Sequence, residues 1–183
     1  MNNIKKLENF ERVYELNPID TLKRIGLQNG NTVCDIGAGT GIFTLAASRM
    51  TENKVYALEI DCEMLSLIRE RAKSEGIHNI ELVKVENESL NIESNSIDLA
   101  LIVTVLHEIK NKPTFLTEVL RMLKPNGNVA IIEFHKRDTP MGPPIDHRIA
   151  CGELSQLLRK YGFNKKCEFD LGQNFYCATF NQI

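Results

Sequence analysis

The chain has 183 residues and a net charge of −2, and 25% of its residues are charged and 43% hydrophobic. A chain of this length has room for one domain of ordinary size, so we expect a single domain over residues 1–183. This charge offers no general attraction to nucleic acid or to an acidic membrane, and no apolar run approaches the ~20 residues that cross a bilayer. We therefore expect a cytoplasmic protein with neither partner. The sequence does not indicate an oligomeric state.

The five cysteines include no C-x-x-C pair, which argues against a zinc knuckle or a disulfide framework and favours reduced thiols. Cys167 and Cys177 lie symmetrically about Gly172. A hairpin turning there would place them opposite each other, within bonding range or as two packed thiols.

Apolar strand-like runs alternate with helical patterns beyond a helical N-terminal segment, residues 1–29, which we expect to help cover the site. The expected strands are residues 32–36, 54–60, 79–85, 96–105 and 128–135. The expected helices between them are residues 41–50, 61–76 and 113–127, the last ending at Pro125 and Gly127. This alternation is typical of a doubly wound, Rossmann-like α/β fold with helices on both faces of a mostly parallel sheet.

A proline-rich loop, residues 136–148, interrupts this alternation before a helix at residues 151–162. Long loops in compact domains are usually functional, so it is a candidate active-site lid. Its cations Lys136, Arg137 and Arg148 either contact an acidic substrate or are solvated. Two runs at residues 163–171 and 174–183 predict an antiparallel hairpin, which brings the sheet to seven strands.

A glycine-rich turn follows the first strand and reads Asp35-Ile36-Gly37-Ala38-Gly39-Thr40-Gly41. Its spacing differs from the G-x-G-x-x-G of dinucleotide-binding folds, and no Gly-Lys-Ser/Thr follows to make a phosphate-binding loop. A carboxylate at Asp35 would repel a pyrophosphate but attract the ammonium of a methionine moiety. Glu59, at the end of the second strand, is placed to bind ribose hydroxyls. S-adenosylmethionine fits this pattern better than NAD.

The stretch "VCDIGAGTG" resembles motif I of the class I S-adenosylmethionine-dependent methyltransferases. The resemblance continues through "VYALEIDCEML", "VENESLNIESNSIDLALIVTVLHEI" and "EVLRMLKPNGNVAIIEF". It implies this cofactor and a set of contacts to it: Asp35 near the amino group, the backbone of Gly37, Ala38, Gly39, Thr40 and Gly41 at the amino-acid part, Glu59 on the ribose, Ile60 and Glu86 at the adenine, Asn87 at the ring, and Thr104 and Val105 at the methionine end. The family often has Gly-Asp-Ala where this chain has Val85-Glu86-Asn87, so Glu86 departs from the family's pattern at the adenine, whereas Glu59 follows it at the ribose.

Methyl transfer needs alignment of acceptor and donor, and a base only where the acceptor loses a proton. We single out His107, after the fourth strand, and His135, after the fifth, as candidate catalytic residues, ahead of Glu108 and His147. Each histidine also has a purely structural interpretation. The set His135, Asp138, Asp146 and His147 is a conceivable metal cluster, but Thr104 stands where related metal-dependent enzymes place an acid, so we expect no metal.

From this resemblance we expect a methyltransferase, that is, a transferase that moves a methyl group to a small molecule. The resemblance is nearest to small enzymes related to the ubiquinone and menaquinone C-methyltransferases, without identifying the acceptor. A non-catalytic S-adenosylmethionine-binding module and a methyltransferase acting on protein or RNA remain alternatives, and a nicotinamide oxidoreductase is the rival enzyme.

Overall fold

The computed structural model describes residues 3–86 and 89–183, which form the seven-stranded α/β arrangement that the sequence predicts. The strand order is β3-β2-β1-β4-β5-β7-β6, and β7 is antiparallel to both its neighbours. The chain divides into two compact units, residues 1–92 and 93–183. The expectation of a single domain stays a prediction.

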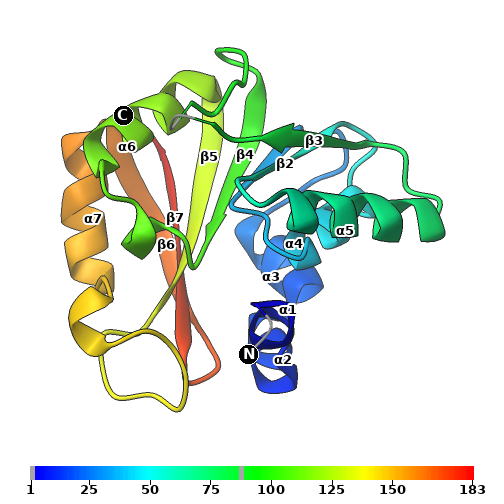
Figure 1. Cartoon of the computed structure of the whole chain (residues 1–183). Coiled ribbons are helices and arrows are strands. Elements are labelled where there is room, and N and C mark those ends of the chain that lie inside the picture. The colour runs from blue at the N-terminus through cyan, green and yellow to red at the C-terminus, as the bar shows by residue number, and fades with distance from the viewer. Residues whose placement is uncertain (1–2, 87–88) are drawn as a thin grey trace. The chain divides into compact units, whose positions relative to one another are not determined.

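The first unit contains three short N-terminal helices followed by three parallel strands (Figure 1). Its elements are α1 (Asn3–Leu7), α2 (Phe10–Leu16), α3 (Pro18–Ile25), β1 (Val33–Ile36), α4 (Ile42–Ser48), β2 (Val55–Glu59), α5 (Cys62–Ser74) and β3 (Ile80–Lys84). In register, Val33 lies beside Val55, and Val55 beside Ile80. The strands therefore end together, and the loops after β1 and β2 are neighbours.

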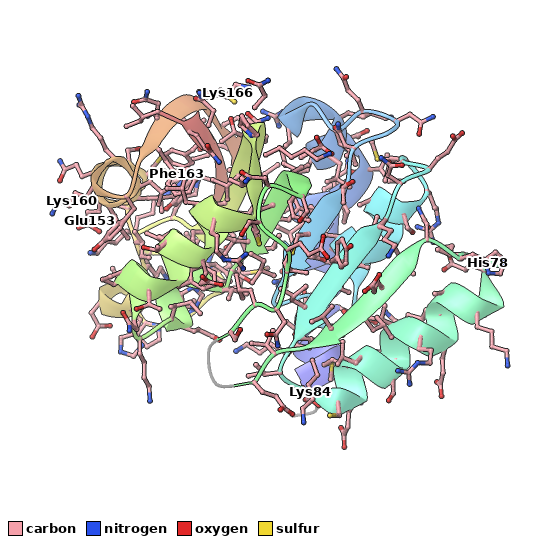
Figure 2. All side chains as sticks on the ribbon, turned by 90° about the horizontal axis from the view of Figure 1, so that it is seen from above. His78, Lys84, Glu153, Lys160, Phe163 and Lys166 are labelled. Atoms are coloured by element: carbon pink, nitrogen blue, oxygen red, sulfur yellow. The ribbon has the colours of Figure 1, made fainter. Side chains whose placement is uncertain are left out.

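The helix α5 begins and ends where the sequence predicts. The side chain of Asp61 accepts a hydrogen bond from the backbone N–H of Glu63, as an N-cap residue does. Gly76 follows the helix with a positive φ of 66°. Figure 2 shows the neighbouring strand β3 running between His78 and Lys84 alongside this helix.

The second unit combines a parallel strand pair with the C-terminal hairpin (Figure 1). Its elements are β4 (Ile97–Val103), the short 3-10 helix η1 (Leu106–Glu108), α6 (Lys112–Met122), β5 (Leu123–Phe134), the 3-10 helix η2 (Ile145–His147), α7 (Cys151–Lys160), β6 (Phe163–Leu171) and β7 (Phe175–Gln182). Six of the seven residues of β4 are buried, as its nearly continuous apolar sequence predicts. Glu153 and Lys160 mark α7 on the outside of this unit (Figure 2).

The helix α6 ends earlier than the sequence predicted. We expected it to reach Pro125 and Gly127, but it ends at Met122, and Leu123 already has extended dihedrals. Pro125 disfavours helical dihedrals in the residue before it, so the helix stops short of the proline. Gly127 is needed for a different reason, because a Cβ there would lie 2.8 Å from the carbonyl oxygen of Ile97.

The C-terminal hairpin forms as predicted, but the expected pairing of its cysteines is wrong. Its turn is centred on Gln173, because Leu171 pairs with Phe175. Cys167 therefore lies opposite Thr179, with its Sγ 3.1 Å from the threonine Oγ1. Cys177 lies opposite Phe169. The turn is centred on Gln173 and not on Gly172, so the residue opposite each cysteine is two positions away from the one we expected. Both cysteines are free thiols.

Candidate active site

The glycine-rich turn after β1 lies where the sequence predicts it, and its backbone has the conformation that glycine allows. Gly37, Gly39 and Gly41 have φ values of 74°, 54° and 82°, in the left-handed region that favours glycine. At Gly41 a Cβ would also lie 2.7 Å from the side chain of Ile68 on α5. The last glycine therefore serves two purposes: it completes the turn, and it lets α5 pack directly against it.

The carboxylate of Glu59, at the end of β2, is built into this turn. Its Oε2 accepts a hydrogen bond from the backbone N–H of Gly39 at 2.8 Å. Its Oε1 accepts the backbone N–H groups of Ile60 at 2.8 Å and Asp61 at 3.0 Å. A carboxylate offers about four lone-pair sites, so acceptor capacity remains for a ligand hydroxyl. The side chain predicted to bind ribose is thus held in place by the turn itself.

Asp35 is a second carboxylate at the turn, and it is buried. Thr44, on α4, donates its hydroxyl to the Asp35 Oδ2 at 2.6 Å. Burial, opposed by this hydrogen bond and reinforced by the charge of Glu59, raises the pKa of Asp35 to about 6. A buried carboxylate of this kind is stabilised in its ionised form by a cation placed beside it.

The N-terminal segment reaches this turn through two contacts. The side chain of Leu7 lies 3.3 Å from the position of a Cβ on Gly39. Glu8 forms an ion pair with Arg71 of α5, and Arg71 also donates to the main-chain oxygen of Thr40 at 3.0 Å. These contacts, which we call the N-terminal clasp (Leu7, Glu8, Arg71 and Thr40), tie the start of the chain to the glycine turn.

The other predicted contacts in this unit differ in their surroundings. Ile60 is 72% exposed, which is unusual for a large apolar side chain and leaves it open to a ligand. Glu86 is exposed and forms an ion pair with Lys84 at 3.0 Å. Asn87 lies outside the described residues. Ala38 and Thr40 are buried, so we expect only their backbone atoms to meet a ligand.

In the second unit, Thr104 follows β4 with a φ of 54°. A β-branched residue rarely adopts this left-handed conformation, and such strain gathers at functional sites. Its backbone N–H donates to the carbonyl oxygen of Ile132 at 2.7 Å, which fixes the turn to β5. Val105 is half-buried beside it. The two residues predicted to meet the methionine end therefore occupy a constrained turn.

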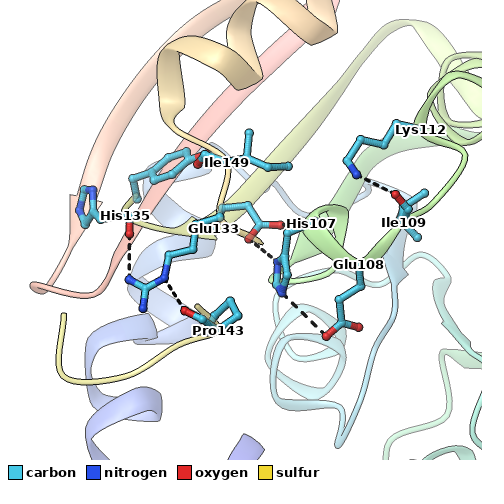
Figure 3. A network of polar contacts seen from close by, with 10 residues as sticks. His107, Glu108, Ile109, Lys112, Glu133, His135, Pro143 and Ile149 are labelled. Atoms are coloured by element: carbon cyan, nitrogen blue, oxygen red, sulfur yellow. Dashed lines mark hydrogen bonds and ion pairs between the residues drawn. The ribbon is translucent and has the colours of Figure 1, made fainter. Parts of the chain in front are cut away.

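His107 is held by Glu133, a residue that the sequence pattern did not single out. The His107 Nδ1 lies 2.7 Å from the Glu133 Oε2, and the His107 backbone N–H donates to Oε1 at 3.1 Å. Both side chains are buried, with exposed fractions of 7% and 1%. Figure 3 shows the His107 ring between the carboxylates of Glu133 and Glu108. The only sequence signal for Glu133 was a carboxylate inside an otherwise apolar strand.

His135, the second candidate catalytic residue, lies apart from this pair (Figure 3). Its Nε2 is 3.3 Å from the Asp170 Oδ1, and its ring is 5.7 Å from that of Tyr176. Its main chain is tied down as well, because its N–H donates to the carbonyl oxygen of Asn174 at 2.9 Å. The structure thus groups His135 with the C-terminal hairpin and His107 with Glu133.

The proline-rich loop, residues 136–148, is organised around the buried side chain of Arg148. Its guanidinium donates to main-chain oxygens and one hydroxyl within 3.3 Å: those of His135, Arg137, Met141 and Pro143, and the Oγ1 of Thr139. It also lies over the ring of Phe134. Arg148 is therefore neither a solvated cation nor an exposed contact for an acidic substrate, because its buried guanidinium bonds to the loop itself. Lys136 forms an ion pair with Glu153 of α7.

Two absences hold for residues 3–86 and 89–183, the part of the chain that the structure describes. No group of three or more His, Cys, Asp or Glu side chains in these ranges is placed to hold a metal ion. No helix in the same ranges has the length and apolar character needed to cross a membrane.

The glycine turn, the buried carboxylate of Asp35 and the order of the strands in the sheet are those of a class I methyltransferase-type domain. A family model described as a methyltransferase domain matches residues 27–171. The chain therefore belongs to the methyltransferase-domain family, as the resemblance of its motifs predicted.

Curated relatives include ubiquinone/menaquinone biosynthesis C-methyltransferases from several bacteria. The one from Marinomonas sp. (strain MWYL1) is 30% identical over 146 residues, covering 78% of this chain and 53% of that protein. The one from Idiomarina loihiensis is 34% identical over 147 residues, covering 79% and 54%. The chain thus spans about half the length of the curated relatives it matches.

Solved structures agree on the fold. A SAM-dependent methyltransferase from Aquifex aeolicus has a TM-score of 0.91 and 28% identity, covering 98% of this chain and 97% of that one. The cyclase SpnF has a TM-score of 0.79 at 19% identity, covering 92% and 81%. This second likeness shows the fold alone, and a cyclase on the same fold means that the reaction must be argued from the site.

Proposed function

We propose that this chain is an S-adenosylmethionine-dependent methyltransferase acting on a small molecule. The observation that carries the proposal is the bond between Glu59 and the amide of Gly39. It makes the acid at the end of β2 and the glycine turn after β1 one preformed unit. A ligand that presents ribose hydroxyls to the acid and an amino-acid group to the turn matches this unit, and S-adenosylmethionine has both.

The residues of the first unit fit such a cofactor in chemistry as well as position. Asp35 is a buried carboxylate whose ionised form the cofactor's ammonium would stabilise. Glu59 keeps acceptor capacity for a ribose hydroxyl, and the exposed side chain of Ile60 offers an apolar face to the adenine. By the family resemblance, Glu86 and Asn87 would also meet the adenine, and Thr104 and Val105 the methionine end. When bound, the cofactor supplies a methyl group activated by a sulfonium.

We further propose that the acceptor loses a proton in the reaction and that His107 takes it. His107 is a titratable group held in one orientation by Glu133, which a base needs. The names of the curated relatives support carbon methylation of a quinone precursor as the reaction class. His135 is engaged with Asp170 and the hairpin, so we assign it a structural role in the loop.

Calorimetric titration tests the cofactor. S-adenosylmethionine and its demethylated product should both bind, and NAD should not. Binding of NAD alone would overturn the proposal in favour of an oxidoreductase. Transfer of a labelled methyl group is then assayed with hydroquinone, phenol, thiophenol and benzylamine. Turnover of hydroquinone or phenol supports the acceptor class, whereas binding without any turnover would favour the non-catalytic module.

A further inference from the structure

His107 and Glu133 make two bonds with each other, and together these bonds set the protonation state of the ring. One oxygen of Glu133 accepts the backbone N–H of His107, which can act only as a donor. The other oxygen lies 2.7 Å from Nδ1. An ionised carboxylate has no proton to donate, so the Nδ1 nitrogen must supply the hydrogen of this bond. In the neutral ring the lone pair is then on Nε2.

Nε2, the other ring nitrogen, faces Glu108 and not Glu133 (Figure 3). The Oε1 of Glu108 is 3.8 Å from Nε2, which is beyond hydrogen-bond distance. Glu108 itself is exposed, and the ring of Phe134 meets the imidazole only edge-on at 6.2 Å between centroids. Nε2 is thus the nitrogen of His107 that Glu133 does not occupy.

The charged groups around the ring act in opposite directions on its pKa. Burial lowers the pKa of His107, but the hydrogen bond and the charge of Glu133, aided by Glu108, outweigh burial and the charge of Lys112 on α6. The net pKa of His107 is raised, so an imidazolium formed at this position is stabilised.

We infer that Glu133 is a positioning residue, which keeps the neutral ring of His107 protonated at Nδ1 so that Nε2 accepts the proton of the methyl acceptor. This inference rests on the proposed function. In the step, an electron pair of the acceptor forms the bond to the methyl carbon, and the pair of the carbon–sulfur bond stays on sulfur. The acceptor's O–H or C–H proton moves to Nε2, and the resulting imidazolium later loses it to water.

The acceptor class follows from this step. A proton acceptor is useful for a neutral hydroxylated ring, methylated at oxygen or carbon, because such a ring becomes a strong nucleophile only as it loses its proton. A tertiary amine needs no base. We therefore expect a hydroxylated aromatic acceptor.

The variant Glu133→Gln separates this role from simple packing. Glutamine has one acceptor oxygen and one donor NH₂ group in nearly the same volume. If its oxygen keeps the backbone N–H of His107, its NH₂ group faces Nδ1 and can only donate. The ring must then accept at Nδ1 and carry its proton on Nε2, so the tautomer is reversed while the packing is retained. In serine proteases the analogous change from aspartate to asparagine, which also reverses the tautomer of a histidine base, lowers kcat about 10⁴-fold.

Nitrogen NMR of the whole chain, labelled at histidine, measures the tautomer without any acceptor. The His107 signal is identified by its loss in His107→Gln. We expect the neutral wild-type ring to carry its proton on Nδ1, and the E133Q ring to carry it on Nε2 with a lower pKa. The control E108Q should keep the wild-type tautomer. A wild-type proton on Nε2, or the same tautomer in wild type and E133Q, would overturn the inference.

Turnover of hydroquinone tests the proton transfer. We expect E133Q to lower kcat at least about 100-fold with S-adenosylmethionine affinity unchanged, and to move the rise of kcat with pH to lower pH. Equal kcat profiles in wild type and E133Q would contradict the inference. If E133Q fails to fold, the wild-type tautomer still decides the positioning role. If wild type binds no S-adenosylmethionine, the proposed function fails independently of the tautomer result.

Discussion

Arg71 donates a hydrogen bond from α5 to the main-chain oxygen of Thr40, 3.0 Å away in the glycine turn. The same guanidinium holds Glu8, so one side chain fixes both the turn and the N-terminal segment. Removing it should loosen the turn before a ligand arrives. Arg71→Gln should raise the Kd for S-adenosylmethionine about fivefold, as expected for the loss of one hydrogen bond of about 1 kcal/mol.

The matched control for this effect is Arg69→Gln, an exposed arginine on the same helix. Calorimetry should show that Arg69→Gln has the same Kd for S-adenosylmethionine as the wild type. If the two variants bind equally well, the N-terminal clasp does not shape the turn.

The raised pKa of Asp35 predicts a pH dependence of both stability and binding. Because burial favours the neutral acid, the folded chain keeps this proton up to pH about 6, whereas the unfolded chain loses it near 3.8. The contribution of Asp35 to stability is therefore greatest below pH 4 and falls as the pH rises toward 6. A cationic ligand favours the ionised form, so S-adenosylmethionine should bind more tightly as the pH rises through 6, with release of a proton. Calorimetry in buffers of different ionisation enthalpy measures that release.

The variant Asp35→Asn should separate stability from function. It keeps an oxygen to accept the Thr44 hydroxyl but removes the buried charge. We expect a higher Tm at pH 7.5 than wild type, weaker S-adenosylmethionine binding, and no change of affinity with pH near 6. An unchanged pH dependence in this variant would assign the titration to another group.

The buried guanidinium of Arg148 should keep the proline-rich loop in one ordered conformation. Lysine has no planar fork and cannot reach all of these oxygens, so Arg148→Lys leaves several buried acceptors unsatisfied. We expect a loss of about 2 kcal/mol in the free energy of unfolding and faster proteolysis within residues 136–148. Arg137→Lys, whose side chain is exposed, should change neither. Equal cleavage rates in wild type and Arg148→Lys would mean that the loop keeps its conformation without the Arg148 guanidinium.

The close packing of Gly41 predicts a contrast between two glycine substitutions. Gly41→Ala places a Cβ 2.7 Å from Ile68 at a φ of 82°, which should cost about 2 kcal/mol or more. Gly152→Ala, inside α7, meets nothing within 4 Å and should stabilise the chain by about 0.5–1 kcal/mol. Denaturant unfolding measures both. A harmless G41A would show that α5 can move away from the turn.

The sequence was most informative where periodicity and turn chemistry acted together. The alternation of apolar strands and amphipathic helices predicted all seven strands, and D-x-G-x-G-x-G predicted a glycine-rich turn, in which all three glycines have positive φ. Both signals are local, so they do not depend on which distant segments meet.

What the sequence could not predict depends on contacts between distant residues. Glu133 occupies a position in β5 that alternation alone assigns to a strand, and only the fold brings it to His107, 26 residues earlier. The sequence favoured an exposed Arg148, because its acceptors are mainly backbone oxygens, which every residue has and which no sequence pattern marks as partners. The partner of Cys167 depended on the exact centre of one turn.

Glu59 provides the most direct test of the central claim that the glycine turn and this acid bind S-adenosylmethionine together. Glu59→Gln replaces an acceptor of three backbone N–H groups with a side chain that has only one acceptor oxygen. Calorimetry should show an affinity for S-adenosylmethionine at least about tenfold below wild type, while the exposed control Glu70→Gln stays within about twofold. Wild-type affinity in E59Q would contradict the claim.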